Sequence, residues 1–392
     1  MKQIIFKKID MMKIILFNWF LYPITLGVFS VNYSFIFYPF FASLKRKTLL
    51  IPPLQINLMM GAFLLILLGG LISNPLASGD NILRSLISFF IFMSIFSFAF
   101  VEIDKNLVNL FKYALISISC LFSLYAFCSF FYHGGNINRY GIKDLVGSQR
   151  YGFIYLIGVF SLFYLDMEKR YNKILRLIGL WLISVGIMLT FSRASIVSFI
   201  AVLGLYYVVQ IAKIRTINLD AVLKSIPKVI LLILSLFIIY KLFPLPVKFF
   251  LDRIINRYFF KTTAVFLAAE SSEGSRLRIW SDIFNYVCQF PLTGSVYLGT
   301  WASKSVNAGS AHSQYMDILF RTGFLGFFLY MYLICKTFLF LRKEDKGLFL
   351  GIFGVLVYGL FHETFKESHG AFVLAFVVGM YVTHIRQLKN NC

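Results

Sequence analysis

The chain has 392 residues, of which 59% are hydrophobic and 14% are charged, and its formal net charge is +21. A soluble domain of this size needs far more polar surface, so this composition excludes the soluble globular class. The apolar runs are long and continuous, and irregular backbone cannot face lipid, so spanning helices are favoured over the strands of an outer-membrane barrel. The predicted fold class is all-α, a polytopic integral membrane protein with about 12 transmembrane helices.

The candidate spans follow one another along the whole chain. They cover residues 14–31, 33–44, 49–72, 81–101, 107–132, 151–165, 174–191, 194–211, 226–243, 318–341, 347–361 and 369–385. The second run is short for a full crossing, and Pro39 would kink it. We therefore expect a single membrane domain, residues 1–392, in which residues 244–317 form one long loop with short helices.

The charge of the loops predicts on which side of the membrane each one lies. With the basic N-terminus in the cytoplasm, the even-numbered runs lead into loops with lysine or arginine, such as residues 45–47 and 342–346. The opposite short loops are poorer in positive charge, and residues 73–80 carry no lysine or arginine. Because cytoplasmic loops collect these two residue types, both termini are expected in the cytoplasm.

Two external segments are basic although the topology does not require it. Residues 133–150 and the long loop 244–317 would face the periplasm of a bacterium. Long loops escape the positive-inside rule, so these charges are permitted there. They remain candidates for binding anionic groups such as lipid phosphates.

The sequence contains no complete motif for binding a metal or a nucleotide. The five cysteines form no CxxC pair, and there is no GxxxxGK[ST] loop and no DxD-type carboxylate pair. His362 and Glu363 begin like a zincin helix, but Lys366 stands where the second histidine is required. Glu367 and His369 could ligate a metal, or they belong to a polar external loop. We expect no metal and no cofactor.

A first candidate site lies where two apolar runs meet at the external surface. The stretch 189–195 reads LTFSRAS and contains Arg193. An arginine between two spans is costly unless it is paired or faces water. Its planar fork suits a phosphate, and the alternative is a snorkelling arginine at a helix end.

A second candidate lies in the long loop. The stretch 274–280 reads GSRLRIW, and the spacing of the apolar residues after Ser275 predicts an amphipathic helix. Arg276 would then sit in the first turn, close to backbone N–H groups that attract anions. The alternative is an ordinary solvated helix start.

A third candidate lies at the external mouth of the span 318–341. The stretch 309–315 reads GSAHSQY and contains His312. A neutral imidazole near pH 7 can take a proton from a sugar hydroxyl. The alternative is a hydrogen-bonded histidine at the interface.

Together, in this order and spacing, the three motifs resemble the bacterial superfamily of O-antigen ligases and O-antigen polymerases. The matching stretches are TFSR at 190–193, GSRL at 274–277 through Trp280 with Pro291 and Gly294 following, and HSQY at 312–315 through TGFLG at 322–326. The resemblance covers about residues 150–330. The His-Asn pair common in this family is His312-Ser313 here, which puts any role of an amide at that position in doubt.

The resemblance implies a reaction and roles for individual residues. Such enzymes take a glycan from undecaprenyl diphosphate at the periplasmic face of the inner membrane and join it to an acceptor hydroxyl, without a nucleotide sugar or a metal. By this resemblance Arg193 and Arg276 would hold the diphosphate, and His312 would act as the catalytic base. Arg150 and Arg278 would be further substrate contacts.

The resemblance also implies partners and leaves the acceptor open. The partners would be an undecaprenyl-diphosphate-linked oligosaccharide, an acceptor glycan or lipid A-core, the lipid bilayer and a chain-length regulator, with no nucleic acid. A polymerase joins repeat units, whereas a ligase moves the finished chain to lipid A-core. The Phe-, Ile-, Lys- and Tyr-rich composition favours the polymerase slightly. A flippase for lipid-linked glycans is the alternative from another class, but it would need polar groups deep within its spans.

Overall fold

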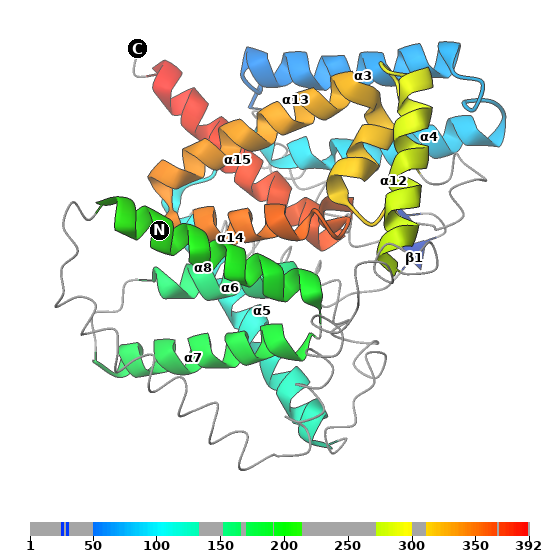
Figure 1. Cartoon of the computed structure of the whole chain (residues 1–392). Helices are drawn as coiled ribbons and strands as arrows, with labels where there is room; N and C mark the ends of the chain where they lie inside the picture. Colours follow the sequence, from blue (N-terminus) through cyan, green and yellow to red (C-terminus); the bar gives the residue numbers. More distant parts are fainter. Residues whose placement is uncertain are drawn as a thin grey trace.

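The computed structural model describes residues 25–26, 29–30, 50–132, 152–165, 170–190, 192–213, 272–299, 311–366 and 368–390. Nearly all of these residues are helical (Figure 1). The α-helices are α3 (Leu54–Ser73), α4 (Asp80–Met93), α5 (Lys105–Tyr132), α6 (Gly152–Phe163), α7 (Arg170–Leu189), α8 (Arg193–Lys213), α12 (Ser272–Gln289), α13 (Gln314–Glu344), α14 (Lys346–Tyr358) and α15 (Ser368–Asn390). Two 3-10 helices, η2 (Ser94–Phe100) and η4 (Thr364–Lys366), complete the helical elements that are described.

The predicted class, a polytopic all-α membrane protein, is confirmed. Six helical segments of the described chain are long and apolar enough to cross a membrane, and α6, α14 and most of α8 form three shorter apolar helices. These nine segments coincide with nine of the predicted spans. The predicted spans 33–44 and 226–243 lie outside the described residues, so the total of about 12 crossings stays a prediction.

The structure differs from the predicted helices within the first span, 14–31. Strands β1 (Thr25–Leu26) and β2 (Phe29–Ser30) pair antiparallel there, with Thr25 opposite Ser30. The sequence between the two strands contains Gly27, a residue type that favours turns over helix interiors. The remainder of this predicted span lies outside the described residues.

Helix α6 lies at the centre of one half of the structure. Its residues 152–162 are all buried, and it packs against α5, α7, α8 and α14. Figure 1 shows α6, α7 and α8 on one side of α14, with α3, α4 and α13 on the other. Small residues allow these helices to approach closely, because Gly158 contacts Ser119 and Gly186 contacts Ser123, both on α5.

The segment after α12 folds back under α13 and interrupts it. The backbone N–H of Phe324 donates to the carbonyl of Pro291 over 2.8 Å, and that of Ser295 donates to the carbonyl of Phe320 over 2.7 Å. Between these contacts, Gly323 has φ of 67° and breaks α13 into two helical parts. A Cβ at Gly323 would collide with the Pro291 carbonyl. The glycine therefore permits both the left-handed backbone and the close approach.

The same segment is anchored to α3. The Asn74 amide donates to the carbonyl of Gly294 over 2.9 Å, and the Tyr297 hydroxyl donates to the carbonyl of Phe63, in the middle of α3, over 2.8 Å. The Tyr297 ring also packs edge-on against Phe89 of α4 at 5.1 Å between centroids. These contacts fix α12 and the start of α13 relative to the pair α3–α4.

Candidate active site

The predicted base, His312, lies in the turn that leads into α13. It is half-buried, and its φ of 55° is in the left-handed region that non-glycine residues rarely adopt. The following residues are tied to the chain beyond α14, because the N–H of Gln314 donates to the carbonyls of Gly359 (2.8 Å) and His362 (3.1 Å). The side-chain oxygen of Gln314 in turn accepts from the N–H of Phe365 over 2.6 Å. A strained residue persists where its surroundings hold it in this way.

The backbone of Ala311, the residue just before His312, is held by two side chains. The N–H of Ala311 donates to Glu363 Oε1, and the carbonyl of Ala311 accepts from the indole Nε1 of Trp280 over 2.9 Å. Trp280 lies one helical turn after Arg276 on α12. The structure thus places the helix that carries Arg276 directly against the turn that carries His312.

The first motif, around Arg193, begins α8. Ser192 precedes the helix, and its hydroxyl accepts from the N–H of Ser195 over 3.4 Å, the geometry of an N-cap. The Tyr358 side chain, at the end of α14, lies beside Ser192 and Ser195. A Cβ at Gly152, the first residue of α6, would collide with the Ser195 hydroxyl and contact Tyr358. The starts of α6 and α8 are therefore neighbours.

These contacts converge on the chain between α14 and α15, residues 358–366, which we call the α14–α15 corner. Within it, the rings of Tyr358 and His362 stack at 4.6 Å between centroids. Tyr358 contacts the start of α8, while His362 and Glu363 bind the turn before α13. The N-termini of α6, α8 and α13 thus face one region, and helix N-termini carry partial positive charge that favours anions.

The predicted arginines differ in their exposure to solvent and in how much of each the structure describes. Arg276 is half-buried, but the prediction that it lies in the first turn was wrong, because α12 begins at Ser272 and Arg276 starts the second turn. Arg278 is exposed. Arg193 is the first residue of α8, but its side chain and the whole of Arg150 lie outside what the structure describes.

The structure also reveals a buried ion pair that sequence reasoning missed. Arg321 Nε lies 2.7 Å from Asp317 Oδ2, one turn earlier on α13, and Arg321 Nη1 donates to the carbonyl of Tyr297 over 2.7 Å. Both side chains are almost fully buried. Opposite charges four residues apart inside an apolar run were the signal that could have revealed the pair.

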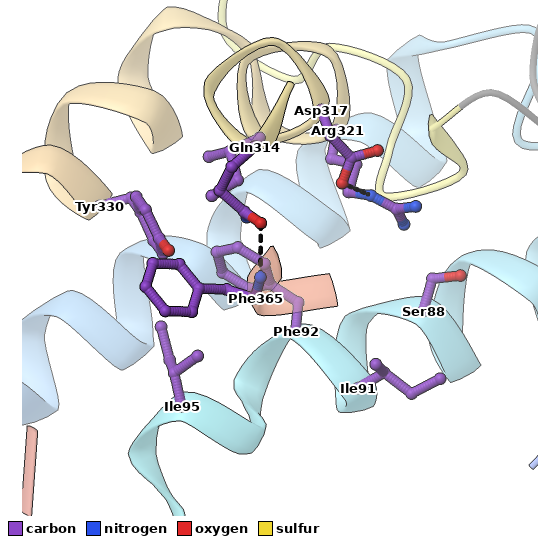
Figure 2. A pocket seen from close by; sticks show the side chains of 10 residues that line it. Ser88, Ile91, Phe92, Ile95, Gln314, Asp317, Arg321, Tyr330 and Phe365 are labelled. Carbon is purple, nitrogen blue, oxygen red and sulfur yellow. Dashed lines mark hydrogen bonds and ion pairs between the residues drawn. The ribbon is translucent and has the colours of Figure 1, made fainter. Parts of the chain in front are cut away.

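This ion pair lines a pocket between α13 and α4 (Figure 2). Most of its polar lining comes from α13, where Gln314 and Tyr330 join the ion pair, while its apolar wall comes from α4, η2, α13 and η4. The lining residues are Ser88, Ile91, Phe92, Ile95, Gln314, Asp317, Ile318, Arg321, Tyr330 and Phe365. The pocket lies beside the first turn of α13, two residues beyond His312.

Metal ligands do not gather in the described part of the chain, where no three His, Cys, Asp or Glu residues are placed to hold an ion. His362 and Glu363, the false start of a zincin motif, instead contact Tyr358 and the backbone of Ala311. His369 is buried at the start of α15, and Glu367 lies outside the described residues.

Comparison with known proteins identifies the region that contains all three motifs. Residues 178–331 match the family model described as O-antigen ligase, and this stretch includes the second part of α7, all of α8 and α12, and the first part of α13. No curated protein matches the chain. This match confirms the predicted resemblance to the superfamily of O-antigen ligases and polymerases over residues 178–331, the stretch that carries the three motifs.

Proposed function

We propose that this protein is a glycosyltransferase of the bacterial inner membrane with its active face toward the periplasm. It takes a glycan from undecaprenyl diphosphate and joins it to an acceptor hydroxyl. One observation supports this most strongly: the turn with His312 contacts both the helix that carries Arg276 and the α14–α15 corner, and this corner also contacts the start of α8. A base and cationic groups near one region are what such a transfer requires.

In the proposed reaction, the imidazole of His312 takes the proton from the acceptor hydroxyl. The acceptor oxygen forms a bond to the anomeric carbon of the donor glycan, and the bond from that carbon to the diphosphate oxygen breaks. Undecaprenyl diphosphate leaves with the bonding electron pair. Arg193 and Arg276 stabilise its developing negative charge, helped by the N-termini of α6, α8 and α13, and no metal ion takes part.

The substitution His312→Ala tests the base. We expect it to abolish glycan transfer by the purified protein in lipid vesicles, because the variant lacks the imidazole proposed to deprotonate the acceptor, while the protein still inserts into the membrane. The replacement of Cys288 by Ala, at an exposed position of α12, is a suitable control. Transfer at the wild-type rate by His312→Ala would disprove the assignment.

Of the two activities in the superfamily, we propose the polymerase, which joins repeat units. Deletion of the gene, followed by gel electrophoresis of the lipopolysaccharide, decides between the two. Core carrying a single repeat unit supports a polymerase, whereas bare core with long chains left on the carrier means a ligase. Loss of carrier-linked units from the periplasmic leaflet would mean a flippase.

A further inference from the structure

We infer that Glu363 and Trp280 are positioning residues, which hold the backbone N–H and the carbonyl of Ala311 and thereby orient His312 toward the reacting groups. This inference rests on the proposed function, since it concerns the residue proposed as the base. Neither side chain touches the substrate in this role. The interactions involved are the two hydrogen bonds to the backbone of Ala311, which we call the Ala311 clamp.

The Ala311 clamp is built from three distant parts of the chain. Trp280 on α12 precedes Ala311 by 31 residues, and Glu363 in the α14–α15 corner follows it by 52 residues. Ala311 itself is fully buried. A buried residue needs partners for both its backbone N–H and its carbonyl, and outside a helix or sheet these must come from elsewhere. Here, side chains supply both.

The two hydrogen bonds act on successive peptide planes, because the N–H that binds Glu363 lies before the Cα of Ala311 and the carbonyl that binds Trp280 lies after it. The second plane ends at the nitrogen of His312, so its orientation affects where the His312 side chain points. The φ of His312, 55°, is an unfavourable value for histidine. Without its restraints, the turn would relax toward ordinary backbone angles and carry the imidazole away. Ser313 and Gln314 restrain the chain only on the far side of His312, through Gly359 and His362. The Ala311 clamp therefore supplies the restraint on the near side.

The Ala311 clamp also couples the two motifs of the proposed site. Trp280 lies one turn from Arg276, so the same indole that fixes the Ala311 carbonyl also fixes the distance between the helix of Arg276 and the turn of His312. Ile279 and Ile283 of α12 pack with Ala311, Leu319 and Phe320 in one small apolar cluster beside it. The apolar cluster holds the elements together, and the hydrogen bonds set their angle.

Conservative variants separate this role from simple loss of folding. Glu363→Gln keeps an oxygen that can accept from Ala311, whereas Glu363→Ala does not, and Trp280→Phe keeps a ring but removes the donor. Glu344→Ala, at an exposed site near the end of α13, and Trp181→Phe on α7 are matched controls. Each purified variant is measured in vesicles for kcat, KM and the pH dependence of kcat, with a carrier-linked oligosaccharide as donor.

We expect Glu363→Ala and Trp280→Phe to lower kcat about 10- to 100-fold with KM changed less than about threefold, because small displacements of a base slow the chemical step. Glu363→Gln should stay within about threefold of wild type, with an unchanged midpoint in its pH profile. The two damaging changes act on the backbone of one residue, Ala311, so the double variant should lose less than the product of the single losses.

Other results would overturn the inference. Wild-type kcat in both Glu363→Ala and Trp280→Phe would show that the Ala311 clamp is unnecessary. If the Glu363→Gln variant is inactive, or if the midpoint of the pH dependence of its kcat is shifted, the carboxylate charge acts on the reaction directly. If the Glu363→Ala variant fails to insert into the membrane, the kcat values of Glu363→Gln and Trp280→Phe still decide whether the Ala311 clamp is needed. Failure of the proposed function can be distinguished from failure of this inference, because the wild-type protein itself would then transfer no glycan.

Discussion

The buried pair Asp317–Arg321 allows a quantitative test of what holds α13 in place. Replacing Arg321 by Met removes a guanidinium that lies 2.7 Å from the carboxylate and 2.7 Å from the carbonyl of Tyr297. Asp317 is 2% exposed, so its charge would be left without its cation in a medium of low dielectric constant. Breaking a buried ion pair by removing one partner costs about 3–5 kcal/mol. We therefore expect the free energy of unfolding to fall by about 4 kcal/mol, roughly a thousandfold in the folding equilibrium.

The measurement is unfolding of the purified protein in mixed micelles by increasing SDS, followed by circular dichroism. The double variant Asp317→Leu with Arg321→Met removes both charges and should recover part of the loss, since apolar replacements of buried ion pairs are often close to neutral. Its remaining deficit should be about 1–3 kcal/mol, from the Tyr297 carbonyl that loses its donor. The reasoning is refuted if Arg321→Met alone stays within about 1 kcal/mol of wild type, or if the double variant is no better than the single one.

Three further outcomes are expected. Gly323→Ala should destabilise the protein by more than about 1 kcal/mol in the same titration, because Gly323 has φ of 67° and lies close to the Pro291 carbonyl. The control Gly61→Ala, at a position with open space around it, should not destabilise the protein in this way. Equal effects of the two substitutions would contradict the argument from the backbone of Gly323. Arg193→Lys and Arg276→Lys should each lose glycan transfer in vesicles, because a point charge does not replace a bidentate fork, and full activity of either would remove that residue from the diphosphate clamp. Fluorescent-protein fusions to either end of the chain should fluoresce and alkaline phosphatase fusions should be inactive, and the reverse at either end would overturn the proposed orientation.

The spans could be predicted because each one is governed by its own residues. A run such as Leu54–Ser73 must satisfy its backbone hydrogen bonds internally, since lipid offers none, and α3 follows directly on Pro52 and Pro53 as a helix start should. The place of His312 at the start of α13 was predicted for the same reason. The start of α12 was missed by three residues, because polar residues around a helix start carry no apolar periodicity.

The contacts around the site could not be predicted in this way. Glu363 looked like part of a failed metal motif, and the sequence contains no sign that its carboxylate binds the backbone of Ala311, 52 residues earlier. Asp317 and Arg321 could be paired with each other from their spacing, but their third partner, Tyr297, lies on a segment that the sequence assigned to a surface loop. That segment is instead packed against α3 and α13.

The sequence by itself therefore determined the membrane class, the positions of most of the described helices and the identity of three motifs. These properties depend on residues close together in the chain, on the hydrophobicity of a run or the spacing within a turn. Only the tertiary structure decided that the turn with His312 lies against both the helix of Arg276 and the α14–α15 corner, and that Trp280 and Glu363 hold the backbone of Ala311. Such contacts join residues far apart in sequence, and they arise only when the helices pack and every buried polar group must find a partner.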